Sequence, residues 1–153
     1  MPDELLPYVG LLSSVLGLMD THKHTYPELT NEININSGGI ATDAAIYTDS
    51  KDFSKYTVMY EVKGKVLYEK LPFVLEMMHE IIYETKFEDE KRLREIIARI
   101  KSRMESNMTG SGHTVAMLSA MAQFSPSSYY SDILRGYQYY EFYRKRQTGI
   151  LTV

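Results

Sequence analysis

The sequence predicts an α+β fold in which most of the chain is helical. Apolar residues recur at helical spacing in several segments, two short stretches alternate as strands do, and glycine, proline or polar clusters separate these segments. The chain has 153 residues, of which 44% are apolar and 24% are charged. A chain of this size and composition can bury a substantial core. We therefore expect residues 1–153 to form a single two-layer α/β sandwich domain.

Two helices are expected before the strands. The apolar stripe of residues 4–19 runs nearly all round a helix, so this first helix is predicted to be buried. Thr25 and Glu28 have the spacing of a capping box around Pro27. They predict a second, short helix that ends at the pair Gly38 and Gly39.

Two strands follow, over residues 40–48 and 57–63. The second alternates Val58, Tyr60 and Val62 with more polar neighbours, and a polar turn at residues 49–52 joins the two as a hairpin. Two strands alone make a poor sheet. We therefore expect that the sequence lacks its first strand or strands, and that the natural chain carries them before residue 1.

The remainder is predicted to be helical. One helix is centred on residues 73–82, with Pro72 in its first turn, and acidic residues 88–90 open another. A Gly-Ser-Gly break at residues 110–112 precedes a helix over residues 114–123. Ser125 and Pro126 are expected to begin a last helix that continues to Arg146.

Composition excludes several classes of function. Cysteine is absent, which excludes a disulfide framework, a thiolate zinc finger and a cysteine nucleophile. The net charge of −3 shows no basic excess for nucleic acid. The uncharged run from Leu5 to Met19 is shorter than the roughly 20 residues of a spanning helix. Asp3 and Glu4 precede this run, unlike the basic start of a signal peptide. We expect no membrane partner and a cytoplasmic location.

Histidines offer little chemistry in the sequence. His22 and His24 lie in a polar loop where only Asp20 and Glu28 could complete a metal site, so both histidines are expected in solvent. His79 is interpreted as a packed or half-exposed helix residue. Neither H-E-x-x-H nor H-x-x-E-H occurs.

Two other motifs are better explained by structure than by chemistry. Residues 110–113 precede a helix but follow no strand and carry no Lys-Ser/Thr pair, which excludes a phosphate-binding P-loop and a nucleophile elbow. The last helix interleaves aromatic with basic residues, a pattern that can hold single-stranded nucleic acid. Packing of one aromatic face and the helix dipole explain the same residues, so no nucleic-acid partner is expected.

Several stretches resemble the insulinase-like (pitrilysin-type) zinc metallopeptidases, and within them the presequence protease branch. The most specific are Asn-Glu-Ile-Asn-Ile-Asn at residues 31–36 and Ser-Gly-His at residues 111–113. Residues 5–8, 11–17, 25–29, 85–89 and 100–103 agree, so the resemblance covers nearly the whole chain.

The resemblance implies a place in a much larger enzyme. Such peptidases are built from four similar domains in two halves that close around a peptide, and only the first half carries the zinc motif H-x-x-E-H. This sequence resembles the first domain of the second half. Alignment with that family places Tyr8, Leu11 and Leu12 at the motif's first His, its Glu and its second His. None of these side chains can bind zinc or activate water.

The resemblance therefore implies no catalytic residue and no metal ligand in this chain, with zinc bound elsewhere in the full-length enzyme. The counterpart of the third zinc ligand is expected in or near residues 93–106. We expect a non-catalytic, chamber-forming domain of a zinc metalloendopeptidase that degrades unfolded peptides. Its partners would be the catalytic half of the same polypeptide and the peptide, with self-association possible through an open sheet edge.

An alternative remains open. The sequence contains 13 tyrosines, 9 methionines and no tryptophan, a mixture that suits surfaces which pack against other proteins. A free-standing protein-binding module with a Tyr/Met-rich surface would explain the missing catalytic residues equally well. A small independent enzyme is disfavoured, because no constellation of acid, base and nucleophile is present.

Overall fold

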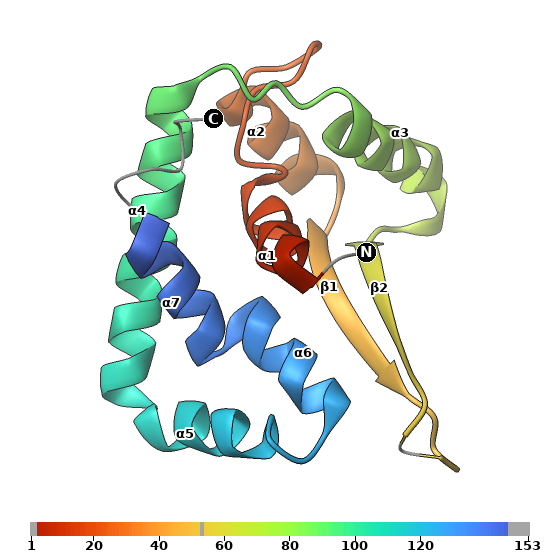
Figure 1. The fold of residues 1–153 in the computed structure, drawn as a ribbon. Coiled ribbons are helices and arrows are strands. Elements are labelled where there is room, and N and C mark those ends of the chain that lie inside the picture. Colours follow the sequence, from red (N-terminus) through yellow and green to blue (C-terminus); the bar gives the residue numbers. More distant parts are fainter. Residues whose placement is uncertain (1–2, 53, 147–153) are drawn as a thin grey trace. The chain divides into compact units, whose positions relative to one another are not determined.

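The computed structural model describes residues 3–52 and 54–146 and confirms a helix-rich α+β fold (Figure 1). Along this part of the chain the elements are η1 (Asp3–Leu5), α1 (Leu6–Val15), α2 (Tyr26–Asn36), β1 (Ile40–Thr48), β2 (Tyr56–Gly64), η2 (Tyr68–Lys70), α3 (Leu71–Tyr83), α4 (Glu90–Gly110), α5 (Gly112–Met121), α6 (Pro126–Arg135) and α7 (Tyr137–Arg146). None of these helices combines the length and the apolar character needed to cross a membrane.

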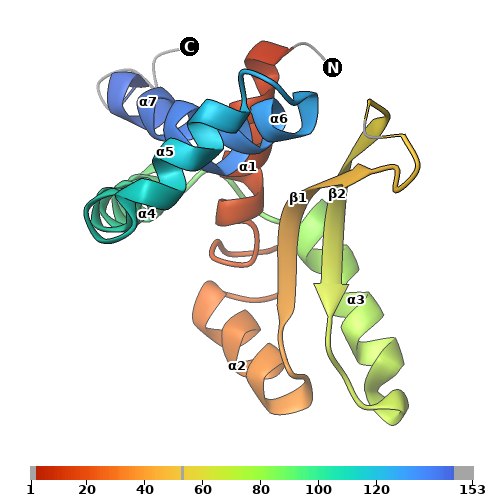
Figure 2. The ribbon, with the colours of Figure 1, turned by 90° about the horizontal axis from the view of Figure 1, so that it is seen from below.

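The hairpin has the predicted form. Strand β1 has the predicted bounds, and β2 is one residue longer at each end than expected (Figure 2). The pairing continues past the strands, where the Gly38 N–H donates to the Lys65 carbonyl at 2.6 Å and the Lys65 N–H donates to Gly39 at 3.1 Å. Gly39 has φ +111°, a conformation that other residues rarely adopt.

The chain divides into two compact units. The first comprises residues 1–11, 44–59 and 97–153, and the second comprises residues 12–43 and 60–96. We call them unit 1 and unit 2. Helices α1 and α4 and both strands contribute residues to each unit.

Unit 2 has an aliphatic core between its helices. Its buried members lie at the end of α1, on α2 and on α3: Leu16, Leu29, Ile33, Met77 and Ile81. The pairs on α2 and on α3 are four residues apart, so each pair lies on one helix face. Burial of each such side chain contributes about 1.5–3 kcal/mol before entropy is subtracted.

Unit 1 has an aromatic core on α6 and α7. Tyr139 and Tyr143 are buried, their rings meet edge to face at 4.8 Å, and their hydroxyls are hydrogen bonded at 2.8 Å. Gly10 of α1 is buried against this pair, because a Cβ there would lie 2.8 Å from a ring carbon of Tyr139. The tyrosines of the last helix thus act mainly as core residues.

The single last helix predicted over residues 125–146 is wrong. Helix α6 ends at Arg135 and α7 begins at Tyr137. The buried Asp132 explains the break, since its Oδ1 accepts the Tyr137 N–H at 2.7 Å. A Cβ on Gly136 would clash with the same oxygen, so only glycine fits there.

The first helix is also shorter than expected. Helix α1 ends at Val15, four residues before the end of the apolar stripe. Gly17 has φ +81°, a left-handed conformation that ends helices. Leu16 and Met19 are nevertheless buried. The stripe therefore marks buried positions correctly, although its last part is not helical.

Candidate functional site

Helix α1 carries the three positions that the resemblance aligns with a zinc motif. Tyr8, Leu11 and Leu12 have i, i+3, i+4 spacing, which places them on one side of the helix. Tyr8 is 39% exposed, Leu12 is 38% exposed and Leu11 is half-buried. The Tyr8 ring packs edge to face on Phe142 at 5.0 Å. The structure thus gives these side chains packing contacts, while their equivalence to the zinc motif stays a prediction.

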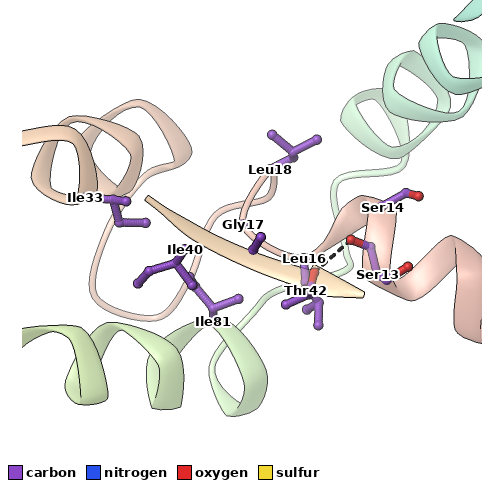
Figure 3. Close-up of a pocket in the computed structure, with 10 residues that line it drawn as sticks. Ser13, Ser14, Leu16, Gly17, Leu18, Ile33, Ile40, Thr42 and Ile81 are labelled. Carbon is purple, nitrogen blue, oxygen red and sulfur yellow. Dashed lines mark hydrogen bonds between the residues drawn. The ribbon is translucent and has the colours of Figure 1, made fainter. Parts of the chain in front are cut away.

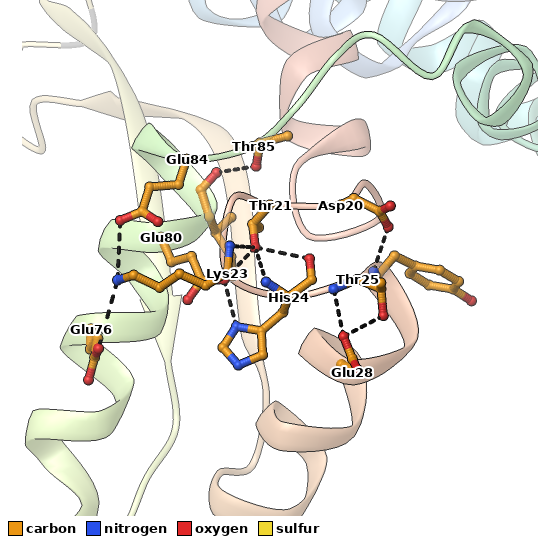
Figure 4. A network of polar contacts seen from close by, with 12 residues as sticks. Asp20, Thr21, Lys23, His24, Thr25, Glu28, Glu76, Glu80, Glu84 and Thr85 are labelled. Carbon is orange, nitrogen blue, oxygen red and sulfur yellow. Dashed lines mark hydrogen bonds and ion pairs between the residues drawn. The ribbon is translucent and has the colours of Figure 1, made fainter.

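A polar network in unit 2 is the main cluster of titratable groups (Figure 4). Its centre is Glu80 of α3, whose side chain is fully buried. The Thr21 hydroxyl donates to Glu80 Oε1 at 2.5 Å, and His24 Nδ1 lies 2.8 Å from the same oxygen. Within residues 3–52 and 54–146, Glu80 Oε2 has no hydrogen-bond partner.

The network ties the loop between α1 and α2 to the end of α3. Thr21 forms an antiparallel bridge with Thr85. The His22 N–H donates to the Glu84 carbonyl at 3.0 Å, and the Lys86 N–H donates to Asp20 at 2.8 Å. The buried carboxylate therefore lies beneath a loop that backbone hydrogen bonds also hold.

A row of acidic residues continues this network to the surface. Glu76, Glu80 and Glu84 are spaced four residues apart on α3, so they share one face. Lys23 Nζ lies 3.3 Å from Glu84 and 3.9 Å from Glu76, and the Glu84 carboxylate raises the pKa of Lys23. These exposed pairs contribute little to stability, so Glu80 remains the energetically important member.

The expectation that both loop histidines face solvent is wrong for His24. His22 is exposed as expected, but the His24 side chain is only 29% exposed because it bonds to Glu80. The partner lies 56 residues away, beyond the reach of local pattern analysis. One sequence signal was available, because Glu80 is three residues from Met77 and therefore falls on the apolar stripe of its helix.

This network has the residue types of a hydrolytic triad without the geometry. In a triad the hydroxyl bonds to one imidazole nitrogen and the carboxylate to the other. Here the Thr21 hydroxyl and His24 Nδ1 both bond to the same carboxylate oxygen. Thr21 is also only 2% exposed, which leaves no access for a substrate. The arrangement can stabilise a loop but cannot activate a nucleophile.

The other notable feature of unit 2 is a pocket of about 270 Å³ (Figure 3). It is lined from α1 and the turn after it, from α2, from β1 and from α3, by Ser13, Ser14, Leu16, Gly17, Leu18, Ile33, Ile40, Ala41, Thr42 and Ile81. The Thr42 hydroxyl donates to the Ser13 carbonyl at 2.8 Å across one side of it. None of the ten lining residues is ionisable, so the pocket can receive an apolar group and cannot perform acid–base chemistry.

Metal binding finds no support in the side chains at hand. No group of three or more His, Cys, Asp or Glu residues in the described part of the chain is arranged to hold a metal ion. The fold and its side chains define a helix-rich α+β domain of the insulinase-like, presequence protease type.

Comparison with known proteins gives the family. A family model for a peptidase-associated domain, found with subfamily C of the insulinase-like metallopeptidases, matches residues 1–145, and the chain belongs to this family. The chain is 32% identical over 142 residues to protein HypA of Clostridium perfringens, which covers 93% of the chain and 15% of that protein.

Other relatives carry the name presequence protease. The mitochondrial presequence protease of Xenopus tropicalis is 26% identical over 136 residues, which covers 89% of this chain and 13% of that protein. Presequence protease 1, chloroplastic/mitochondrial, of Arabidopsis thaliana is 28% identical over 142 residues, covering 91% and 13%. The chain thus spans 13–15% of the length of these curated relatives.

Proposed function

We propose that the chain is a non-catalytic wall domain of a larger zinc metalloendopeptidase that degrades unfolded peptides. One observation carries the proposal. The helix that resembles the family's zinc helix presents Tyr8, Leu11 and Leu12, none of which can bind zinc, in a chain that corresponds to 13–15% of its relatives. The zinc would be held by another part of the full-length enzyme.

A wall domain contributes through geometry. Enclosure of a flexible peptide removes part of its translational and rotational freedom and orients it toward a distant reactive centre. The same enclosure admits unfolded peptides and excludes large folded proteins. Its partners would be the catalytic half of the same polypeptide and the peptide, without nucleic acid or membrane. The cytoplasmic location stays a prediction from the sequence.

A peptide-cleavage assay tests this proposal. A fluorogenic unstructured peptide is incubated with the 153-residue chain and, separately, with the natural protein that contains it. We expect turnover only by the longer protein, and we expect a zinc chelator to abolish it. Chelator-sensitive turnover by the chain alone, or an inactive longer protein, would contradict the proposal.

Self-association of the isolated chain is a further expectation. In the described part, the sheet has only two strands, so each strand has one unpaired edge, and such edges pair readily between molecules. Light scattering across a range of concentrations should give a mass that rises above that of a monomer. A monomeric mass at the highest concentration would contradict this expectation.

A surface of unit 1 favours the binding-module alternative. Helix α5 has no buried residue, and Met117, Met121 and Phe124 are 58%, 47% and 89% exposed. Exposed apolar side chains grouped in this way mark protein interfaces. In the wall-domain proposal a neighbouring domain covers them, and in the alternative a separate protein does. The size of the native protein separates the two.

A further inference from the structure

We propose that the edge of β1 at residues 40–43 is a docking site for an extended segment of the same natural polypeptide. This segment lies outside the 153 residues, adds a strand beside β1 and inserts one apolar side chain into the pocket at Leu16 and Ile81. The inference rests on the proposed function in one respect, namely that this chain is part of a longer polypeptide.

The backbone of β1 is available for pairing on one side. In the described structure β1 is hydrogen bonded to β2 alone. No backbone hydrogen bond described outside the helices and the sheet involves residues 40–43. The adjoining residue differs, because the Ala44 carbonyl accepts a hydrogen bond from Arg135 at 2.9 Å. The available edge therefore includes residues 40–43 and stops before that guanidinium.

The pocket reaches this edge. Ile40, Ala41 and Thr42 are consecutive and all line it. Since successive side chains of a strand point to opposite faces, a pocket over one face would touch only alternate residues. Contact with three in a row places the pocket alongside the strand, where an added strand would lie.

The pocket fits one apolar side chain. Its lining includes Leu16, Ile33 and Ile81, which are also members of the unit 2 core. An aliphatic cavity of about 150 Å³ is enough to hold benzene, so a volume of about 270 Å³ admits a phenylalanine ring or a branched aliphatic side chain. A charged side chain is excluded, because burial without a partner is costly. Backbone pairing with side-chain pockets is the usual basis of strand addition.

The rest of the same polypeptide is the occupant that fits best. The pocket opens onto the core, so its occupant completes the hydrophobic core of unit 2. A substrate peptide leaves after each turnover and would expose that core each time. Two strands alone are marginally stable, and the relatives provide most of their chain outside the matched region.

Hydrogen exchange with mass spectrometry tests the proposal on the longer natural protein and on the 153-residue chain. In the longer protein, without any peptide added, we expect the outward amides of residues 40–43 to exchange roughly 100-fold more slowly than in the short chain, because paired edge amides open only with their sheet. Equal exchange in the two proteins would overturn the proposal.

Other occupants give different results that also overturn it. Protection that appears only after an unfolded peptide is added would identify a substrate site. Protection in the short chain that increases with its concentration would identify a second copy. Peptidase activity is measured on the same longer protein, so an inactive protein with a protected edge would refute the proposed function and leave this inference intact.

A pair of substitutions locates the effect. Ala41→Arg places a charge in the pocket and should abolish the protection of residues 40–43 in the longer protein, whereas Ala98→Arg on the exposed surface of α4 should leave it unchanged. Retained protection in the Ala41 variant would contradict insertion at the pocket. The comparison of unsubstituted proteins tests the docking itself if the variant does not fold.

Discussion

Two buried carboxylates, one in each unit, show two ways in which this sequence uses an acidic residue inside the protein. Glu80 in unit 2 is 0% exposed, and Asp132 in unit 1 is 1% exposed. Glu80 bonds to Thr21 and His24, which are 59 and 56 residues away. Asp132 instead accepts the N–H of Tyr137, only five residues away.

The difference lies in what each carboxylate holds. Asp132 sets a local boundary, where one helix ends and the next begins. Glu80 fixes a loop to a helix that is distant in sequence, and its removal leaves two buried polar groups without an acceptor. An unsatisfied buried donor costs about 1–3 kcal/mol. Glu80 should therefore contribute more to the stability of its unit.

Replacement of Glu80 should have the largest effect. Glu80→Ala should lower the free energy of unfolding by about 3 kcal/mol, because Thr21 and His24 both lose their acceptor and a cavity remains. Urea unfolding measures the change. Glu76→Ala on the same helix, where the side chain is 64% exposed, is the matched control and should change stability by less than about 0.5 kcal/mol. Similar losses in both variants would contradict the account of Glu80.

Asp132 and Gly136 should give a smaller, coupled effect. Asp132→Ala should cost about 1–2 kcal/mol, the range for loss of a helix cap. Gly136→Ala should be costly in the natural sequence and cheaper in the Asp132→Ala background, because the nearest atom to the new Cβ is the Asp132 carboxylate oxygen. A double-mutant cycle in urea measures this coupling. Strictly additive losses would show that the carboxylate does not impose the glycine.

Tyr143 should make stability sensitive to alkaline pH. Burial raises the pKa of the Tyr143 phenol. Its stabilising contribution is therefore complete below the ordinary tyrosine pKa of about 10 and is lost as pH rises above that value. Tyr143→Phe should cost about 1 kcal/mol at pH 7 for the lost hydrogen bond to Tyr139, and it should flatten the decline above about pH 10. Urea midpoints from about pH 7 to 11 measure this, with the exposed Tyr83→Phe as control; an unchanged slope would count against the prediction.

The smallest effect is expected at the start of α2. Hydrogen bonds from the Thr25 hydroxyl and N–H lower the pKa of Glu28. A lowered pKa means that the contribution is present above the ordinary value of about 4.3 and is lost as pH falls through the folded value. Glu28→Gln should therefore reduce the acid sensitivity of the melting temperature between about pH 3 and 6, and Glu69→Gln on η2 should not. Equal acid sensitivity in the natural and Glu28→Gln proteins would refute this role.

The features predicted correctly from the sequence depend on neighbouring residues. Alternation and composition predicted the bounds of β1, and the spacing of Thr25 and Glu28 predicted the start of α2. Both signals are complete within a few residues of the feature that they specify. The short segments at residues 31–36 and 111–113 likewise carried the family resemblance, which the family match confirms.

The features that were missed depend on contacts between distant residues. The helix break at Gly136 requires the packed position of Asp132, and the burial of His24 requires Glu80 from another helix. The pocket beside β1 draws its lining from four separate segments, so no sequence window contains it. Side-chain pattern specifies elements, while sites of this kind arise only after the elements pack.

The size of the native protein tests the central claim most directly. An antibody raised against this chain is used to blot a lysate of the source cells. The account predicts a single band several times heavier than the 17.7 kDa of this chain, because the domain is one wall of a larger peptidase. A band at 17.7 kDa would contradict it and would identify the chain as a free-standing binding module.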